Sequence, residues 1–539
     1  MAADAVPERI VLRGGSVIAT AGPMRADVGI ANGVITDVGL VPGRPGDAVV
    51  DATDRLVMPG FVDAHSHADG LLGDPDVTRA LLRQGVTTVV VGQDGVSYAP
   101  GDGAYAAEYF AAINGAHPTY RGGGVSQFLA SVADTSAVNA GYLVPAGTVR
   151  FEVCGRRAGP ASADELARMI VLVEQGMADG ALGLSTGLDY VPGIFQDAVE
   201  IAALCAPVAQ AGGLYVSHMR GGYEANAAAG VAEMIDIARR ASRQAATRLP
   251  VHVSHFHADA DIVLRQLAVF ETVGVDVTFD AYPYIRGCTL LAMPLLPPDV
   301  SALPSREVVF LLRDATRRSA LRAAAISRAR HNPSLGEEWS ELITLAHVAA
   351  PEFAWTHGLT LAAAAARSGS DPMDFAFDLL AASQLECGAI MAVHNPRPRE
   401  ELARIFTHPG HLGGSDGIFI GRHPHPRAAG TFARYLREYV RELGVWTWAD
   451  AADHLSAHPV RRFGLGRRGV IEPGAVADLI LVDPGTVGDT ATYERPRSLA
   501  VGIDDVFVAG VPVLADGELT GARPGRGLLR SRSSDRSPV

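Results

Sequence analysis

Residues 58–67 read MPGFVDAHSH, a short apolar stretch that ends in two histidines separated by one residue. Successive side chains of a β-strand point to opposite faces, so His65 and His67 share a face and both can reach one cation. The pair alone is a weak signal, because two nearby histidines are more often ordinary polar or packed residues than metal ligands. Its position at the end of a predicted strand makes it the starting point for reading the rest of the chain.

Beyond this stretch, apolar strands alternate with Ala-rich helical segments as far as residue 464. Examples of the strands are TTVVVG at 87–92, GLYVSH at 213–218 and VHVSH at 251–255. Repeated β-then-α units imply a parallel sheet. A closed (β/α)8 barrel and an open doubly wound sheet both place functional residues where strands end. The number of units and the wide spread of the polar residues favour the TIM-type barrel over residues 59–464.

The flanking sequence is of a different kind. Residues 1–58 and 465–523 contain short β runs broken by Gly and Asn, which predict the two parts of one small β-sandwich beside the barrel. Residues 524–539 are polar, rich in Arg and Ser and without periodicity, which predicts a disordered tail. The segment 295–350 is interpreted as an insertion that either covers the rim as a lid or forms a solvated helix pair.

Composition restricts the chemistry. The chain has 539 residues, of which 48% are hydrophobic and 19% charged, as expected for a folded α/β protein larger than one small domain. All 46 basic residues are arginine. Without lysine there is no Schiff-base nucleophile, no phosphate-loop lysine, no pyridoxal anchor and no carboxylated lysine between two metal ions. A ligand that bridges two ions must therefore be Asp, Glu or Cys.

Charge and cysteine content indicate the partners and the compartment. The net charge of −13 disfavours a broad basic surface for nucleic acid or anionic lipid. The four cysteines are scattered without C-x-x-C spacing, which argues against a disulfide framework. Neither an export leader nor a stretch of about 18 apolar residues is found. We therefore expect a cytoplasmic enzyme that acts on a small molecule, with no nucleic-acid or membrane partner and with its oligomeric state unknown.

More residues of metal-ligand type follow other predicted strands. His218 ends GLYVSH, His255 ends VHVSH, and Asp416 lies in the turn HLGGSDG. Each taken singly is more often a core or capping residue. Together with His65 and His67 they offer the imidazole and carboxylate donors that Zn²⁺ takes, and all of them lie at predicted strand ends. The sequence thus predicts a divalent metal site at the carboxyl end of the barrel.

These motifs resemble those of the amidohydrolase superfamily and, within it, the D-aminoacylase group of N-acyl-D-amino-acid deacylases. The resemblance covers nearly the whole chain through ordered blocks: PGFVDAHSHAD at 59–69, QGVTTVVVGQDGVS at 84–97, GALGLSTGLDYVPG at 180–193, VSHMR at 216–220, VSHFH at 253–257, DAYPY at 280–284 and GGSDG at 413–417. It implies a metal-dependent hydrolase on a (β/α)8 barrel, with metal-site positions at His65, His67, His218, His255 and Asp416. Asp416 would also take a proton from the attacking water and return it to the leaving group.

The chain departs from this group at three positions. Asp94, in Gly-Gln-Asp-Gly, stands where the group has a metal-binding Cys. It either replaces that thiolate as a ligand or bridge, which makes Mn²⁺ or Co²⁺ more acceptable, or only forms a turn beside a single ion. His257 stands where the group has Lys, and Cys288 where it has Ser, both at positions that contact the substrate carboxylate in the group. His257 would hold an anion there or act as a second acid or base.

The resemblance also assigns residues to the substrate. Tyr190, in GLDYVPG, would donate its phenol to the developing oxyanion, with Arg220 orienting it. Arg427, in HPRAAGTFARY, would bind a carboxylate through its planar fork, and Tyr282, in DAYPY, joins the substrate-binding set. Packing at the rim or a surface salt bridge is the alternative for these residues.

The first hypothesis is hydrolysis of the amide C–N bond of an N-acyl amino acid, with D stereochemistry implied by the resemblance. One or two divalent ions, Zn²⁺ before Mn²⁺ or Co²⁺, would lower the pKa of water from 15.7 to about 7. The second hypothesis is a hydrolase or cyclase for a cyclic amide, a lactone or a specialised biosynthetic intermediate. The third is an inactive relative that binds a metabolite, against which the full ligand set argues. A Cys–His hydrolase is disfavoured because no Cys neighbours a suitable His block.

Overall fold

Eight parallel strands form the sheet at the centre of the molecule. The computed structural model describes residues 8–19, 22–332, 334–393 and 396–531. In spatial order the strands are β16 (His411–Gly413), β12 (Val277–Ala281), β11 (Val251–Val253), β10 (Leu214–His218), β9 (Gly183–Gly187), β8 (Asn139–Pro145), β7 (Val86–Val91) and β6 (Phe61–Asp63). Every residue of β7 is buried, as expected for a parallel strand covered on both faces.

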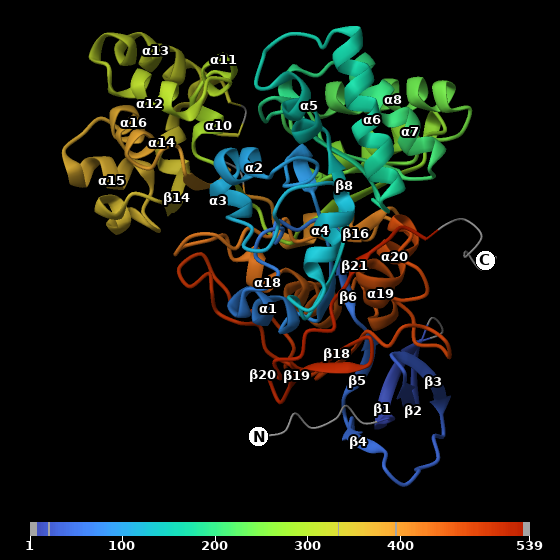
Figure 1. Cartoon of the computed structure of the whole chain (residues 1–539). Helices are drawn as coiled ribbons and strands as arrows, with labels where there is room; N and C mark the ends of the chain where they lie inside the picture. The colour runs from blue at the N-terminus through green and yellow to red at the C-terminus, as the bar shows by residue number, and fades with distance from the viewer. Residues whose placement is uncertain (1–7, 20–21, 333, 394–395, 532–539) are drawn as a thin grey trace.

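Backbone hydrogen bonds between the first and last strands close this sheet into a barrel. Just beyond β6, Ala64 N donates to Gly413 O at 3.0 Å, and Asp416 N donates to His65 O at 2.7 Å. These bonds join the carboxyl ends of β6 and β16, and helices surround the strands (Figure 1). The predicted (β/α)8 barrel is confirmed.

The helices that follow the strands begin at residues suited to cap them. Asp74 accepts from the backbone N–H groups of the first turn of α1, and Ser162 and Glu165 form a capping box at the start of α6. Within the described ranges no helix is both long and apolar enough to cross a membrane. The helices are α1 (Pro75–Leu82), α4 (Val125–Val132), α6 (Ala163–Ala178), α7 (Ala198–Gln210), α8 (Ala227–Ala245), α9 (Ala260–Thr272), α17 (Arg399–Phe406) and α18 (Arg427–Arg434).

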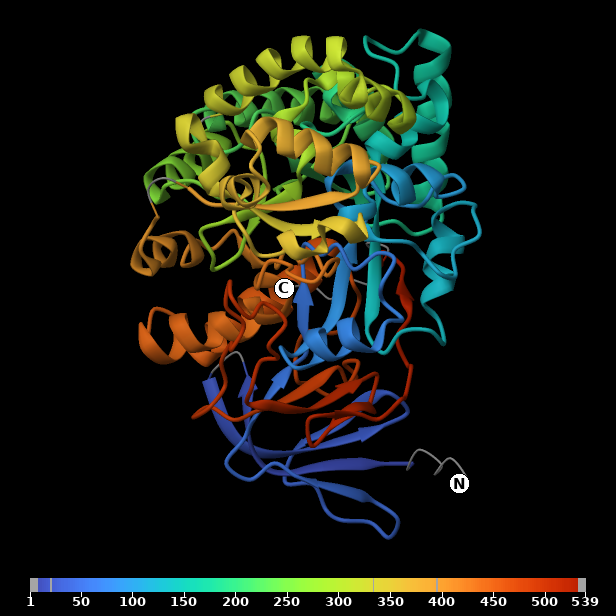
Figure 2. The ribbon, with the colours of Figure 1, turned by 90° about the vertical axis from the view of Figure 1, so that its left-hand side faces the viewer.

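Strands from both ends of the chain form a separate sheet, as expected from the flanking sequence. Its two halves meet where β5 pairs antiparallel with β17, with Leu56 opposite Val482. Figure 2 shows this sheet at one end of the molecule, beyond the barrel. Its strands are β1 (Ile10–Ala19), β2 (Gly22–Ala31), β3 (Val34–Gly39), β4 (Ala48–Asp51), β5 (Leu56–Pro59), β17 (Leu479–Val482), β18 (Ile503–Val508), β19 (Val511–Ala515) and β20 (Glu518–Leu519).

A long insertion separates β12 from β16 and builds its own core, at the upper left of Figure 1. It extends beyond the predicted limits of 295–350, because β15 pairs antiparallel with both β13 and β14 and draws the flanking segments into one unit. The insertion contains β13 (Gly287–Leu290), α10 (Ala292–Leu295), α11 (Pro298–Ser301), α12 (Ser305–Arg313), α13 (Ala315–His331), α14 (Trp339–Leu342), β14 (Ile343–Val348), α15 (Leu361–Ser368), α16 (Pro372–Ala382) and β15 (Cys387–Met391).

The segment predicted to be a disordered tail is ordered in its first part. Gly527–Leu528 form β21, which runs parallel to β8. The side chain of Leu528 is buried in a cluster with Val62, Leu143 and Leu182. A two-residue strand is too short to produce a periodic pattern, so the sequence gives no signal of it. The rest of the predicted tail, 532–539, lies outside the described residues.

We expect that Leu528→Ala lowers the free energy of unfolding by about 2–3 kcal/mol, because it removes a buried side chain. Leu529→Ala is the matched control: Leu528 is 9% exposed and Leu529 61%. Denaturant unfolding of both variants checks the prediction. Equal stability of the two would contradict the packing of β21 against the barrel.

Candidate metal centre

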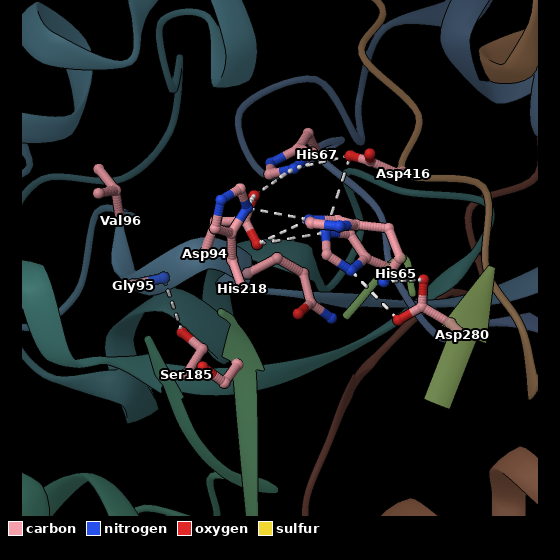
Figure 3. A network of polar contacts seen from close by, with 12 residues as sticks. His65, His67, Asp94, Gly95, Val96, Ser185, His218, Asp280 and Asp416 are labelled. Atoms are coloured by element: carbon pink, nitrogen blue, oxygen red, sulfur yellow. Dashed lines mark hydrogen bonds and ion pairs between the residues drawn. The ribbon is translucent and has the colours of Figure 1, made fainter. Parts of the chain in front are cut away.

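Six side chains that the sequence singled out converge at the carboxyl end of the barrel (Figure 3). All six are buried. They form two groups of three that share one member, and in each group the ligand atoms lie within 4.8 Å of one another. The first group is His65, His67 and Asp94, the second is Asp94, His218 and His255, and Asp416 lies against the first.

The carboxylate of Asp94 lies between the two pairs of imidazoles. Its Oδ1 is 3.6 Å from Nε2 of His65 and 3.6 Å from Nε2 of His255. Its Oδ2 is 3.7 Å from Nε2 of His67 and 3.8 Å from Nδ1 of His218. Each oxygen therefore faces one imidazole from each pair. This is the arrangement that a carboxylate needs to serve two neighbouring cation positions.

Asp416 completes the first group from the opposite side of the barrel seam. Its Oδ1 lies 3.3 Å from Nε2 of His67 and 3.8 Å from Nε2 of His65. Its Oδ2 lies 2.8 Å from Nη2 of Arg427. One oxygen thus faces the histidines while the other is held by a guanidinium.

The polar atoms at the centre fit a bound cation. Nε2 of His65 and Oδ1 of Asp94 are buried and have no hydrogen-bond partner among the described residues. Burying a polar atom unpaired is costly, so such atoms in a native structure call for a ligand. Both are atom types that bind Zn²⁺ and similar divalent ions.

The electrostatics agree with this fit. Burial lowers the pKa of His65, but the carboxylates of Asp280 and Asp94 outweigh burial and raise it to about 9. Burial likewise lowers the pKa of His218, but hydrogen bonds to Asp189 and Asp94 raise it to about 10. The surrounding carboxylates therefore favour positive charge at the centre, which a metal ion supplies while leaving the imidazoles neutral.

Three of the six residues have unusual backbone conformations. Asp94, His255 and Asp416 have φ angles of 54°, 33° and 49°, a left-handed region that side-chain-bearing residues rarely adopt. Such conformations cluster at functional sites, where the surrounding structure holds them. At His255 the backbone N–H donates to Oδ1 of Asp280 at 2.9 Å. The chain turns sharply at each strand end and so directs these side chains to a common point.

The turn that carries Asp94 is wedged between neighbouring strands. Gly92 has φ +78°, and a Cβ atom there would lie 2.3 Å from the carbonyl oxygen of Leu143. Ser185 accepts from the Gly95 N–H at 3.2 Å and donates to the Gly92 carbonyl (Figure 3). Only glycine fits at position 92, and the packing fixes the position of the Asp94 carboxylate.

Three residues that sequence reasoning missed hold the imidazole rings. His65 Nδ1 lies 3.4 Å from Oδ2 of Asp280, His67 Nδ1 lies 3.1 Å from Oδ1 of Asn114, and His218 Nε2 lies 3.2 Å from Oδ2 of Asp189. In each ring the bonded nitrogen is the one that faces away from the centre. Donation to these oxygens leaves the other nitrogen free as a ligand and fixes the ring orientation.

The missed residues differ in the signal they carried. Asp189 and Asp280 lie inside GLDYVPG and DAYPY, two of the blocks that carry the family resemblance, so their position was a usable signal. Asn114 ends the short helix α3 (Ala111–Asn114), in a segment without a recognisable motif.

A cavity of about 750 Å³ opens above the centre. Its floor includes His67, Asp94 and Asp416. The insertion forms part of its wall through α13, so this segment covers one side of the barrel rim. Apolar side chains line much of the remainder, among them Ile113, Ile285, Met293, Met391 and Ile418. The cavity is therefore suited to a small molecule with an apolar part.

Five of the predicted substrate or catalytic residues line this cavity: Asp416, Tyr190, His257, Tyr282 and Cys288. The Tyr190 hydroxyl lies 2.9 Å from Oγ1 of Thr289, and burial raises the pKa of Tyr190 well above its usual value. The Tyr282 ring lies on the cavity wall between the His257 ring, at 4.4 Å, and the Arg427 guanidinium, at 4.5 Å. Cys288 lies on the same wall.

Two predicted substrate residues lie elsewhere. Arg427 is fully buried beneath Tyr282 and pairs with Asp416, and it is not on the cavity wall formed by the described residues. Arg220 is held by Glu233 and by two backbone carbonyls and is absent from the same wall. Each guanidinium forms an ion pair with a carboxylate 11 or 13 residues away on a neighbouring loop or helix, a pairing that sequence spacing does not reveal.

The predicted acid–base role of His257 is not supported by its surroundings. Its Nε2 donates to the Tyr282 carbonyl at 2.9 Å, and its Nδ1 accepts from Nη2 of Arg397 at 3.1 Å. Burial, and then the charge of Arg397, lower the pKa of His257 to about 3. The ring is therefore neutral near pH 7, and both of its nitrogens are engaged.

Known proteins resemble this chain over nearly its whole length. The amidohydrolase family profile matches residues 48–514. A D-aminoacylase from Alcaligenes xylosoxydans xylosoxydans is 31% identical, over 98% of this chain and 99% of its own. A structure of N-acyl-D-glutamate deacylase from Bordetella bronchiseptica, with zinc and a phosphonate mimic of the reaction's tetrahedral intermediate, has 31% identity and a TM-score of 0.79, covering 96% and 99% of the two chains. A D-aminoacylase structure described for its binuclear metal center has 29% identity and a TM-score of 0.78, covering 97% and 100%.

Burial raises the pKa of the Cys288 thiol to about 11, so the thiol is neutral at pH 8. We expect iodoacetamide to modify it about 100-fold more slowly at pH 8 than in the urea-unfolded chain, where the thiol has an ordinary pKa. The rate should still rise between pH 8 and 10 as the thiolate forms. Peptide-level mass spectrometry measures it. A rate that levels off below pH 9 would reveal a stabilised thiolate and reopen the case for a cysteine nucleophile.

Proposed function

The chain belongs to the amidohydrolase family, and we propose that it hydrolyses the amide C–N bond of N-acyl-D-amino acids with water activated at the metal centre. The observation that carries this proposal is the Asp94 carboxylate among four imidazoles, with unpartnered atoms on both Asp94 and His65. The similar D-aminoacylase and N-acyl-D-glutamate deacylase support the substrate class.

The proposed ligands of the divalent ions are the six side chains of the centre. His65 and His67 would hold an ion at one position and His218 and His255 at the other, with the Asp94 carboxylate within reach of both. Zn²⁺ is the preferred ion because it takes imidazole and carboxylate donors, while the carboxylate at position 94 also makes Mn²⁺ or Co²⁺ acceptable. A divalent ion at this site supplies Lewis acidity, which makes water nucleophilic near neutral pH and polarises the scissile carbonyl.

Asp416 is the proposed general base and acid. Burial raises the pKa of Asp416, but the positive charge of Arg427 and interactions with the neighbouring histidines outweigh burial and keep it below its usual value. The carboxylate is therefore ionised and able to take a proton from the attacking water. It then returns this proton to the departing amine nitrogen as the C–N bond breaks.

Tyr190 is the proposed hydrogen-bond donor to the oxygen that becomes negative during the attack. Its raised pKa keeps the phenol protonated, and its ring lies 5.2 Å from that of His218, beside the centre. A donor held ready in a buried site stabilises developing charge more than a donor in water does. The imidazole rings are held by three positioning residues, Asp189, Asp280 and Asn114, which contact the rings and take no direct part in the reaction.

We expect Asp416→Asn to lower kcat by about 10²–10⁴-fold, because the amide cannot carry the proton. Turnover of N-acetyl-D-amino acids, metal content by mass spectrometry and circular dichroism are measured together. Asp261→Asn serves as control, since that side chain is 71% exposed and pairs only with Arg404 on the surface. Undiminished turnover in Asp416→Asn would remove Asp416 as the proton carrier.

Asp94→Asn should lower the metal content by one ion per chain, or weaken binding at least about tenfold, because a neutral amide is a poor ligand for two cations. Equilibrium dialysis with Zn²⁺ measures both stoichiometry and affinity, independently of turnover. If the variant binds the same number of ions with the same affinity as the wild type, Asp94 is not a shared ligand.

A further inference from the structure

A nearly buried guanidinium on the cavity wall has no ion-pair partner among the described residues. Arg397 is 8% exposed and lines the cavity above the metal centre. Its Nη2 donates to Nδ1 of His257 at 3.1 Å, whereas its Nη1 is buried without a hydrogen-bond partner. Within the part of the chain that the structure describes, Arg397 forms no ion pair with a carboxylate within 4.0 Å. The carboxylate of Glu224 lies on the same cavity wall, and the charge of Arg397 partly offsets the rise in its pKa that burial causes, but it makes no ion pair with the guanidinium. Among the described residues, the group that Arg397 bonds is an imidazole.

This arrangement is unfavourable for the protein alone. A buried cation loses its hydration and needs an anion or a full set of acceptors to compensate. The His257 ring accepts one hydrogen bond from the guanidinium through Nδ1 and donates another to the Tyr282 carbonyl through Nε2, so it supplies one acceptor and no negative charge. A carboxylate entering the cavity would supply both the missing charge and the missing acceptor, and it matches the planar fork of an arginine.

His257 gives this guanidinium a defined direction. The ring is fixed from its other side by the bond from Nε2 to the Tyr282 carbonyl, and it packs against the Tyr282 ring at 4.4 Å. His257 follows the metal-centre residue His255 by two positions, so Arg397 is tied to the wall directly beside the centre. A substrate whose carboxylate is a few bonds from its amide would then span the two.

The other arginines near the cavity are already engaged. Arg427 pairs with Asp416; its Nε and Nη1 have no hydrogen-bond partner among the described residues, but it is not among the residues that line the cavity. Arg286 lies over the Tyr493 ring at 4.0 Å. Arg328 donates to the carbonyl of Met293. Arg397 combines deep burial, a place on the wall and an unused donor.

We propose that Arg397, aligned by His257, binds the substrate carboxylate and thereby selects linear N-acyl amino acids over neutral cyclic amides and lactones. The inference rests on the proposed function and adds the residue that sets the charge of the substrate. The chain lacks the lysine that the deacylase group has at position 257, and the segment after β15 supplies a cation at the same part of the wall.

The test compares paired substrates. The wild type is first assayed on a panel of N-acetyl-D-amino acids, including N-acetyl-D-leucine and N-acetyl-D-glutamate, and on the carboxamide of each. In Arg397→Met we expect kcat/KM for the carboxylate substrate to fall about 100-fold, mainly through KM, because a buried charge pair is lost. The value for the matching carboxamide should stay within about threefold, since no charge pair forms there.

Two further variants separate binding from structure. The double variant Arg397→Met/His257→Lys returns a cation to the same wall. Its kcat/KM for the carboxylate substrate should be at least about tenfold higher than that of Arg397→Met. A merely structural role of Arg397 would not produce this increase. Arg399→Gln is the matched control, because that arginine lies near Arg397 in sequence but pairs with Glu400 and Glu442 on the surface. If Arg397→Met does not fold, Arg397→Lys keeps the charge, and its preference for carboxylate over carboxamide then decides.

The outcomes distinguish the two proposals. A metal-loaded wild type that hydrolyses none of the N-acetyl-D-amino acids overturns the proposed function. A wild type that hydrolyses them, with an Arg397→Met variant that loses carboxylate and carboxamide turnover equally or loses neither, overturns the role of Arg397 alone. For Arg397→Lys, a lowered preference for carboxylate over carboxamide supports recognition by the planar fork. Turnover of both substrates that is unchanged, or lowered equally, overturns the role of Arg397.

Discussion

The carboxylate of Asp94, buried among four imidazoles, is the constraint on which the rest of the structure depends. Charged and polar atoms of this density are stable inside a protein only when they are paired with one another and with a bound cation. The barrel meets this requirement where β6 and β16 join and close the sheet. The hydrogen bond from Asp416 N to His65 O, which helps to close the sheet, also brings Asp416 beside the histidines. Barrel closure and assembly of the centre thus depend on some of the same contacts.

The absence of lysine from the whole chain affects both the metal centre and the cavity wall. A carboxylated lysine between two metal ions is excluded, and a carboxylate from Asp94 lies where a shared ligand is needed. A lysine cation on the cavity wall is excluded too, and the guanidinium of Arg397 reaches that wall from the segment after β15. Arginine is bulkier than lysine and needs acceptors in a plane, which His257 supplies on one side. The insertion provides a wall of the cavity, and the segment that follows its last strand, β15, provides the arginine, so this part of the chain belongs to the site as well as covering it.

Most of the fold was predictable because strand ends and helix caps are local features. Alternation of apolar strands with Ala-rich segments predicted the barrel, and the histidines at the ends of β6, β10 and β11 predicted where its functional edge lies. The limits of the insertion and the start of the tail were not predictable, because they depend on pairing between distant segments: β15 with β13 and β14, and β21 with β8. The misplaced arginines have a different cause. Arg427 and Arg220 carry the right chemistry for a substrate contact, but Asp416 and Glu233, which lie on a neighbouring loop or helix of the chain, engage them.

The sequence by itself determined the chemical inventory: imidazoles and carboxylates at the ends of parallel strands, no lysine, and a family with a metal-dependent hydrolase chemistry. Periodicity and motif spacing carry this information because they act over a few residues. Only the tertiary structure decided which nitrogen of each imidazole faces the centre and that Asp94 lies between both pairs. It also decided that His257 lies between Arg397 and the Tyr282 carbonyl, and that Arg397 has no ion-pair partner among the described residues. These outcomes depend on distances of 3–4 Å between atoms far apart in the chain, and burial determines which of those groups carry charge.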